Sequence, residues 1–346
     1  MAVLQIVADR PGAGKTSLAG ALLVHLAAAG KRVAYYKPLS QTPDQDPDVS
    51  FFSGYPLTGA DSSQVPSPQA MPAITGARPR LGEPQAGEIR KTVARLKRQC
   101  DSLLLESPDL ASPDGEASSL PMELSSLIDS RIVLLFRYTA DLDAGEVVGA
   151  GHPFGDRLAA VMINGVTAYR SGHVNQTLAP ALRAQGIPLL GAVGEDRGML
   201  GVTVQQIADS LGGRWAQEPE NGDAPVERFL IGGNIMDAGP TYFGRHSNQA
   251  VITRASRPDI QMAGLMAGVR CLVLTGGDEP TEYVKAEAIE RSVPLILVES
   301  NTLETAEALG GLLDQATAHS RQKIQRFLRL MGQSLDLDSL ASSAVG

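Results

Sequence analysis

The chain has 346 residues, of which 43% are hydrophobic and 20% are charged, and its formal net charge at pH 7 is −8. This composition describes a globular protein with room for two domains and excludes a disordered chain. The acidic balance gives no electrostatic support for nucleic acid or an anionic membrane as a partner. Because Met1 leads directly into an apolar run, with no secretory signal, and the two cysteines lack metal-ligand spacing, we expect a cytoplasmic protein.

Short apolar runs alternate with helical patterns over residues 1–212, which predicts a parallel sheet flanked by helices. Six strands are expected, at residues 2–8, 32–38, 101–107, 131–138, 157–166 and 187–194. Helices are expected at residues 15–30, 88–100, 143–150, 174–185 and 203–213, the first of them ending at Gly30. Between Gln41 and Gly87 the pattern weakens into Pro, Ser, Gly and Asp, so loops and short helices are expected there.

A second, smaller alternation follows a polar, turn-rich linker at residues 213–225. Within a domain at residues 226–317, strands are expected at 226–233, 249–254, 271–277 and 294–300, with helices at 257–268, 281–292 and 302–316. Residues 318–346 are expected to form an amphipathic helix and then a loose tail, with Ile324, Phe327, Leu328 and Met331 on one helix face. Docking of this face onto its own domain is favoured over a partner helix. The predicted fold class is therefore α/β, a P-loop parallel sheet flanked by helices with a second, smaller α/β domain.

The most informative stretch is VADRPGAGKTSL, at residues 7–18, between the first strand and the first helix. It follows the phosphate-loop pattern GxxxxGK[ST], except that Asp9 stands at the first glycine position. Gly12 and Gly14 allow backbone amides to turn inward, Lys15 can reach phosphates, and Thr16 offers a hydroxyl to Mg²⁺. The N-terminus of a helix also favours an anion. The loop therefore predicts phosphate binding despite the missing glycine.

The order of several motifs resembles dethiobiotin synthetases and the synthetase-like domain at the N-terminus of many phosphotransacetylases. The motifs are the loop itself, Lys37-Pro38 at a strand end, Asp48 before a helix, Glu106 ending a strand, Asn164 after a strand, and IPLLGAVGEDRGMLGVTVQQIADSLGG, which ends at residue 213. This resemblance covers roughly residues 1–212 and implies a P-loop domain.

The second half resembles the DRTGG domain that follows the synthetase-like domain in those phosphotransacetylases. The stretch that carries the resemblance is QAVITRASRPDIQMAGLMAGVRCLVLTGG. The Thr275-Gly276-Gly277 turn is present, whereas the Asp-Arg pair of the family reads Ser256-Arg257. The resemblance also implies a homodimer.

The resemblance implies ATP and Mg²⁺ as ligands and assigns residues to them. Lys15 and Lys37 would act on the phosphates or the acid oxygen, and the nucleotide would be held by Gly12, Ala13, Gly14, Lys15, Thr16, Ser17 and Asn164, the last of which would pair with adenine. Thr16, Asp48 and Glu106 would hold the metal. From the residues alone, Asp46 competes with Asp48 for the metal role, Lys37 could be a solvated strand end, Glu106 could cap a turn, and Asn164-Gly165 could be an ordinary turn pair.

Departures from the family limit what the resemblance implies about function. After Glu106 the synthetases carry glycines, but here Ser107-Pro108-Asp109-Leu110 follows, and proline removes an amide from any glycine-lined pocket. The acetyl-transferring domain of phosphotransacetylases would need some three hundred further residues, so acetyl transfer is not expected. In the smaller domain, Arg254, Arg257, Gly276 and Gly277 are either a site for a small anionic ligand or an ordinary βα turn.

Three functional hypotheses remain open on the sequence. The favoured one is an ATP- and Mg²⁺-binding protein with a nucleotide-responsive regulatory or binding role near acetyl-phosphate or acyl-coenzyme A metabolism. The alternative is an ATP-dependent ligase that activates a carboxylate or carbamate, as in dethiobiotin synthetases. The third is a structural ATPase whose domains mediate assembly.

Overall fold

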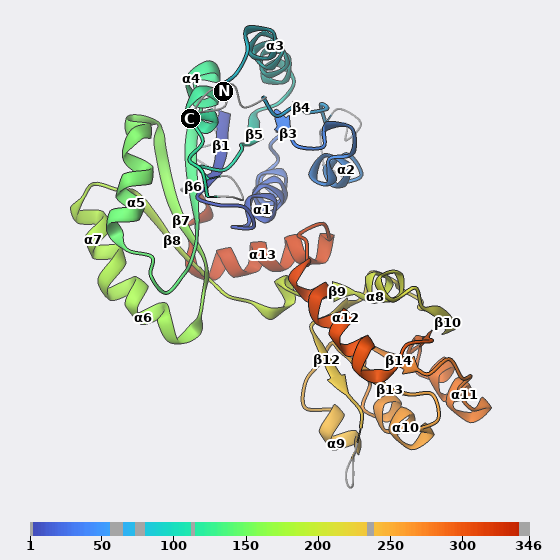
Figure 1. The fold of residues 1–346 in the computed structure, drawn as a ribbon. Helices are drawn as coiled ribbons and strands as arrows, with labels where there is room; N and C mark the ends of the chain where they lie inside the picture. The colour runs from blue at the N-terminus through green and yellow to red at the C-terminus, as the bar shows by residue number, and fades with distance from the viewer. Residues whose placement is uncertain (1–2, 56–64, 73–79, 112–114, 234–238, 339–346) are drawn as a thin grey trace. The chain divides into compact units, whose positions relative to one another are not determined.

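The computed structural model describes residues 3–55, 65–72, 80–111, 115–233 and 239–338 (Figure 1). The chain divides into two compact units, one formed by Met1–Glu195 with Arg321–Gly346 and the other by Asp196–Ser320. The smaller unit is therefore inserted into the chain of the larger one, which resumes with the helix α13 (Arg321–Ser334).

The larger unit contains a six-stranded parallel sheet in the order β2-β5-β1-β6-β7-β8. Its strands are β1 (Val3–Ala8), β2 (Val33–Tyr36), β5 (Ser102–Glu106), β6 (Arg131–Arg137), β7 (Leu158–Val166) and β8 (Leu189–Gly194). Central strands of a parallel sheet are covered on both faces, which is why the sequence shows unbroken apolar runs here. All six predicted strands are confirmed.

The helices of this unit mostly follow the predicted pattern. They are α1 (Lys15–Ala28), α2 (Pro47–Ser53), α3 (Glu83–Gln99), α4 (Leu120–Ile128), α5 (Ala144–Gly151), α6 (Ser171–His173) and α7 (Ala179–Ala184). A π-helical stretch, Val174–Leu178, joins α6 to α7, and the two-residue strands β3 (Leu39–Ser40) and β4 (Gln69–Ala70) pair with each other. Helix α4 was not predicted, although Leu120, Leu124 and Ile128 recur at four-residue spacing and are buried.

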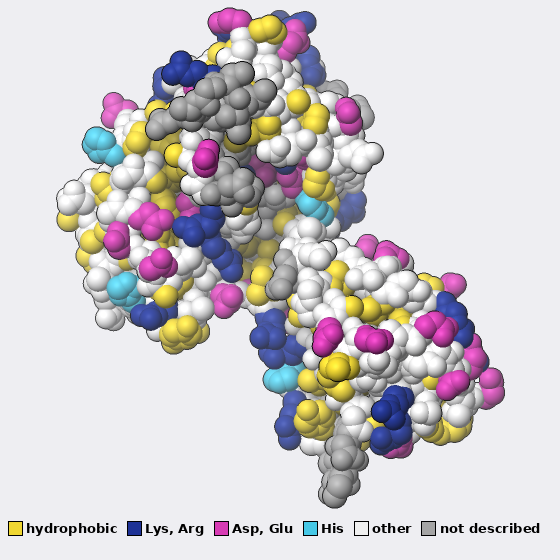
Figure 2. Space-filling view, viewed as in Figure 1, with side chains coloured by type: hydrophobic (Ala, Val, Ile, Leu, Met, Phe, Trp, Pro, Cys, Tyr) yellow, Lys and Arg dark blue, Asp and Glu magenta, His cyan; other side chains and the backbone are white. Residues whose placement is uncertain are grey.

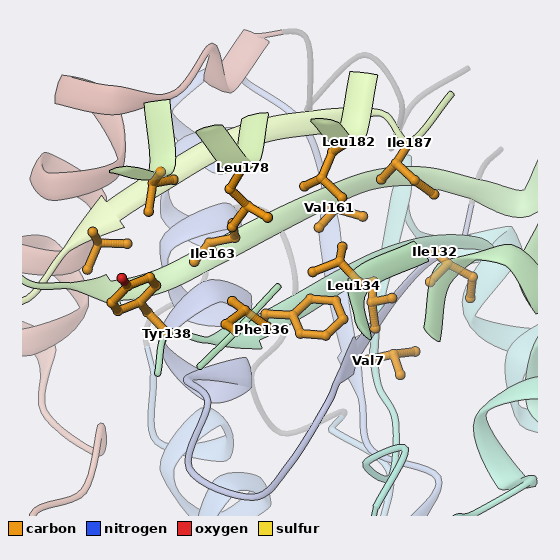
Figure 3. Close-up of a cluster of buried hydrophobic side chains, with 14 of the residues drawn as sticks. Val7, Ile132, Leu134, Phe136, Tyr138, Val161, Ile163, Leu178, Leu182 and Ile187 are labelled. Carbon is orange, nitrogen blue, oxygen red and sulfur yellow. The ribbon is translucent and has the colours of Figure 1, made fainter. Parts of the chain in front are cut away.

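Apolar side chains fill both faces of the sheet. On one face, residues of β1, β6 and β7 pack against α5, α7 and the π-helical stretch, as Figure 3 shows for Val7, Leu134, Phe136, Leu178 and Leu182. Helices α3 and α4 cover the rest of that face over β5 and β2. Helix α1 covers the opposite face, and α13 packs against α1 and β8. The helix that carries the phosphate-loop lysine is thus fixed between the sheet and the C-terminal helix.

Helix α13 docks on α1 through the apolar face that the sequence predicted. Ile324, Phe327 and Met331 are buried. A Cβ added at Gly20 of α1 would lie 2.4 Å from Cδ1 of Ile324, so the absence of a side chain at Gly20 allows this close approach. The helix therefore docks on the larger unit, whose chain it completes.

Substitution of Gly20 by leucine is expected to force α13 away from α1 and to lower the free energy of unfolding by about 1–3 kcal/mol. The matched control is Gly87→Leu, at an exposed position of α3 where an added Cβ would meet nothing within 4 Å. Since leucine is a better helix former than glycine, the control is expected to gain about 0.5–1 kcal/mol. Urea unfolding of both variants measures the difference, and equal changes would rule out the packing argument.

The smaller unit is built on a five-stranded sheet in the order β10-β15-β14-β13-β12. The strands are β10 (Arg214–Gln217), β12 (Arg228–Ile231), β13 (Gln249–Arg254), β14 (Cys271–Thr275) and β15 (Leu295–Val298); β10 is antiparallel to β15, and the other pairs are parallel. The helices are α8 (Val204–Leu211), α9 (Gly239–Phe243), α10 (Pro258–Met266), α11 (Glu282–Glu290) and α12 (Thr302–Asp314). The strands β9 (Val202–Thr203) and β11 (Pro225–Val226) form a separate pair. The four strands predicted here are confirmed.

The division between the units differs from the predicted one. The predicted boundary follows residue 212, but the smaller unit begins at Asp196, because Val204, Ile207 and Ala208 of α8 belong to the same core as Ile252 and Ile296. The predicted linker at residues 213–225 is also corrected, since it contains β10, whose Trp215 pairs with Ile296. The polar composition of that segment reflects an edge strand that is only half-buried. Residues 339–346 of the predicted tail lie outside the described residues.

No helix within the described residues is long and apolar enough to cross a membrane. On the face shown in Figure 2, acidic and basic side chains are interspersed with polar and apolar ones.

Candidate functional site

A cavity of about 1090 Å³ lies at the carboxyl edge of the larger sheet, around the phosphate loop. The ends of β1, β2 and β5 bring the loop, Lys37 and Glu106 to this edge. Ligands of open α/β sheets bind beyond the carboxyl ends of the strands, so the position fits a binding site. Most of the residues predicted from separate motifs therefore line one cavity.

The phosphate loop turns sharply between β1 and α1, with φ of 75° at Gly12 and 109° at Gly14. Asp9, at the position of the missing glycine, ties the loop to β6. Its Oδ1 accepts a hydrogen bond from the backbone amide of Arg137 at 3.1 Å, and its own amide donates to the carbonyl of Leu135 at 3.0 Å. A side-chain anchor thus stands where the standard loop has glycine, and the turn that precedes α1 is retained.

The three predicted metal ligands meet in space. The hydroxyl of Thr16 lies 2.9 Å from Oδ1 of Asp48 and 3.2 Å from Oε1 of Glu106. Within the described residues, no group of three or more His, Cys, Asp or Glu side chains is arranged to hold a metal by itself. Two carboxylates and a hydroxyl nevertheless fit Mg²⁺, which usually takes its remaining ligands from phosphates and water.

Lys37 lies between two carboxylates. Its Nζ is 2.5 Å from Oδ2 of Asp48 and 2.8 Å from Oδ2 of Asp46. Burial lowers the pKa of Lys37, but the carboxylates of Asp48, Glu106 and Asp46 outweigh it, so the pKa lies above its usual value. Lys37 is therefore a charged, partly buried cation in the cavity and not a solvated strand end.

The competition between Asp46 and Asp48 is decided by geometry. Oδ1 of Asp46 accepts hydrogen bonds from the amides of Asp48 and Val49, both at 3.0 Å, and so caps α2. Its other oxygen accepts from the hydroxyl of Ser40 at 2.6 Å. Asp48, which contacts Thr16, is the better candidate for the metal, and Asp46 positions both Asp48 and Lys37.

Glu106 ends β5 in a buried position, where the hydroxyl of Tyr35 donates a hydrogen bond to its Oε2 at 2.9 Å. Burial, together with the negative charge of Asp48, raises the pKa of Glu106 to about 7. The nearby Lys15 and Lys37 and the Tyr35 hydroxyl oppose this rise. A bound divalent cation would stabilise the ionised form of Glu106 and so lower its pKa.

The predicted adenine residue, Asn164, contacts the phosphate loop itself. Its Nδ2 donates to the carbonyl of Ala13 at 2.7 Å, and a Cβ added at Gly14 would lie 2.6 Å from this atom. Asn164 is 8% exposed and Ala13 is 1% exposed, while Ser17 is buried in the first turn of α1. Asn164 thus positions the loop in this structure, and its contact with adenine stays a prediction.

Two further residues of the site were missed from the sequence. Asp109 forms an ion pair with Lys15, and burial raises the pKa of Asp109 although Lys15 opposes the shift. Tyr35 could have been found, because the alternation of side chains in the strand predicted at 32–38 places Tyr35 on the same side as Lys37. No comparable signal existed for Asp109, since it lies in an irregular segment.

In the smaller unit, the Thr275-Gly276-Gly277 turn fastens β14 to the end of β15. The amides of Gly276 and Gly277 both donate to the carbonyl of Val298 at 3.1 Å. The guanidinium of Arg257 pairs with the carboxylate of Asp259 through two hydrogen bonds, at 2.9 and 2.7 Å. These donors are engaged within the chain, so the turn has a structural role, and the predicted small-anion site gains no support from it.

Comparison with known proteins agrees with this layout. The model of the DRTGG domain matches residues 206–312. The phosphate acetyltransferases of Acinetobacter baylyi and Deinococcus radiodurans are each 23% identical to the chain, and the matches cover 97% of this chain and 51% and 50% of those proteins. The chain thus spans about half the length of the curated relatives that it matches.

Among solved structures, the cell division protein MinD of Aquifex aeolicus is 16% identical, with a TM-score of 0.38. The match covers 58% of this chain and 84% of the MinD chain. The CBS and DRTGG domains of Clostridium perfringens pyrophosphatase, complexed with diadenosine tetraphosphate, are 14% identical, with a TM-score of 0.28. That match covers 42% of this chain and 71% of the pyrophosphatase chain. By its match to the family model and to the curated relatives, the chain joins a P-loop region like that in the N-terminal half of phosphate acetyltransferases to a DRTGG domain at residues 206–312.

Proposed function

We propose that the larger unit binds ATP with Mg²⁺ and that the chain is a nucleotide-responsive regulatory or binding protein. The observation that carries the proposal is the convergence of Lys15, Thr16, Asp48 and Glu106 on one cavity beside the phosphate loop. Lys15 would hold the phosphates, and Thr16, Asp48 and Glu106 would surround the metal. Magnesium, when bound, would neutralise phosphate charge and align the phosphates.

The relatives suggest where such a protein acts. Their name, phosphate acetyltransferase, supports a context of acetyl-phosphate or acyl-coenzyme A metabolism, by analogy alone. The DRTGG domain is inserted into the chain of the nucleotide unit, so both of its ends connect to that unit. We expect it to carry the response to nucleotide toward a partner.

The test is titration calorimetry of ATP with Mg²⁺, followed by measurement of ADP release from the same samples. Binding without turnover supports the regulatory role. The absence of binding contradicts the proposal as a whole. Turnover without any added acid would instead identify an ATPase.

An ATP-dependent ligase is the second candidate, and the extent of the cavity favours it. Ser40, Thr42, Met71 and Ser118 also line the cavity, and none of them is among the residues assigned to the phosphates. That space could admit an acid next to the γ-phosphate. ADP release that rises when a carboxylic acid is added would establish the ligase, whereas a panel of acids without effect would exclude it for those acids.

Nucleotide affinity is expected to increase with pH through the titration of Glu106. Below its pKa of about 7 the carboxyl group is protonated and is a poor metal ligand, and above it the carboxylate is available. In the ligand-free protein the same raised pKa makes the folded state lose stability as pH rises from about 4.5 to about 7.

Calorimetry of Mg·ATP between about pH 6 and 8 measures the effect on wild type, Glu106→Gln and the exposed control Glu88→Gln. The ligand's own titration is common to all three proteins. The affinity of wild type and of Glu88→Gln for Mg·ATP is expected to rise with pH by the same amount, and the affinity of Glu106→Gln is expected to lack this rise. Parallel profiles for Glu106→Gln and wild type would contradict the assignment.

A further inference from the structure

The lysine of the phosphate loop already forms an ion pair within the chain. Nζ of Lys15 forms its ion pair with Oδ1 of Asp109, and the two side chains are only 13% and 15% exposed. The same ammonium group is the one that a phosphate loop uses to hold the β- and γ-phosphates of a nucleotide. A phosphate that enters the loop must therefore compete with Asp109 for the charge of Lys15.

The backbone holds Asp109 in this position. The amide of Ser107 donates a hydrogen bond to the carbonyl of Ile6 at 3.0 Å, and the amide of Leu110 donates one to the carbonyl of Ala8 at 2.8 Å. The amide of Ala111 donates to the carbonyl of Asp9 in the loop at 3.1 Å. Because Pro108 restricts the backbone between these anchors, the segment that carries Asp109 is held beside the loop.

The charges around the cavity are unfavourable to a bare phosphate. Among the described residues that line it are two lysines, Lys15 and Lys37, and five residues with carboxyl side chains, which are Asp46, Asp48, Glu106, Asp109 and Glu116. A polyphosphate without a cation adds negative charge next to Asp109 in a partly buried place, where water screens charges poorly. A divalent cation held by Asp48 and Glu106 would offset part of that charge.

We propose that Asp109 is the specificity-determining residue of the phosphate loop: it pairs with Lys15 in the ligand-free protein and admits only a nucleotide phosphate that arrives with a divalent cation. This inference rests on the proposed function, since it takes Lys15 as the residue that receives phosphate. It assigns Asp109 the role of a competing anion, and it explains what the segment that replaces the family's glycines does in this chain.

The test compares wild type with Asp109→Asn, which keeps the size of the side chain and removes its charge. Binding of ATP is measured by calorimetry with Mg²⁺ and, separately, with EDTA. The matched control is Asp156→Asn, an exposed position that precedes β7, at the opposite edge of the sheet from the cavity. Thermal unfolding reports whether the variants fold, and Asp109→Ser serves as a second variant if Asp109→Asn does not.

Asp109→Asn is expected to bind cation-free ATP at least about tenfold more tightly than wild type, which corresponds to about 1.4 kcal/mol. The gain with Mg²⁺ is expected to be much smaller, and Asp156→Asn should match wild type in both conditions. Unchanged or weaker binding of cation-free ATP by Asp109→Asn, or an equal gain with and without Mg²⁺, overturns the inference while the proposed function stands. No binding of Mg·ATP by any of the proteins overturns the proposed function, and the inference with it.

Discussion

Lys15→Ala is expected to weaken the binding of Mg·ATP at least about 100-fold, or by about 2.7 kcal/mol. A lysine that meets phosphate in a partly buried site supplies charge-assisted hydrogen bonds, each worth about 1.5–3 kcal/mol. The variant also leaves the carboxylate of Asp109 in the cavity without its ion-pair partner. Loss of attraction and gain of repulsion therefore act in the same direction.

Calorimetry of Mg·ATP measures this effect, with Lys91→Ala as the control. The side chain of Lys91 is 78% exposed on α3, so its removal changes the net charge equally without touching the cavity. The control is expected to bind as wild type does. If Lys15→Ala retained affinity within a few fold of wild type, Lys15 would not be a phosphate ligand and the loop would need another role.

Gly14→Ala is expected to abolish nucleotide binding and to lower the free energy of unfolding by about 2–5 kcal/mol. Two effects add at this position. The φ of 109° is unfavourable for any residue with a Cβ, and the added Cβ would lie 2.6 Å from Nδ2 of Asn164. The hydrogen bond from Asn164 to Ala13 would break or the loop would move, and either change displaces the amides that face the ligand.

Gly12→Ala separates these two effects. Its φ of 75° is also positive, but an added Cβ would meet nothing within 4 Å, so a cost of only about 1–2 kcal/mol is expected. Urea unfolding and calorimetry on both variants provide the comparison. In Gly14→Ala, the further change Asn164→Ala is expected to recover part of the stability. Equal losses for the two glycine variants would contradict the role assigned to Asn164.

The fold was largely predictable because its elements have strong periodic signals. The six strands of the larger sheet are unbroken apolar runs, such as Leu103–Leu105 and Ile132–Phe136, whose flanks are marked by turn residues. Helix α4 was missed because it lies between the strands predicted at 101–107 and 131–138, after an irregular proline-containing segment that hides its start. The predicted domain boundary lies too late in the chain. The local periodicity of α8 and β10 does not show that α8 packs on the sheet of the smaller unit or that β10 pairs with β15.

The site was predictable to the extent that its residues follow strand ends. Lys15, Thr16, Lys37 and Glu106 are placed by the order of the motifs. Asp48 was predicted to precede a helix, and it lies in the first turn of α2. The choice between Asp46 and Asp48 was not available from the sequence, because two carboxylates separated by one residue become distinct only when one of them caps α2.

The sequence by itself determined a P-loop α/β unit, a second α/β domain and the set of polar residues at the carboxyl edge of the sheet. These follow from local patterns, since hydrophobic periodicity and loop chemistry are carried by neighbouring residues. The pairing of Lys15 with Asp109, the anchoring of the loop by Asn164 and the return of α13 onto α1 were decided by tertiary structure alone. Each of these contacts joins residues at least 94 positions apart, and only the folded chain brings their charges and surfaces together.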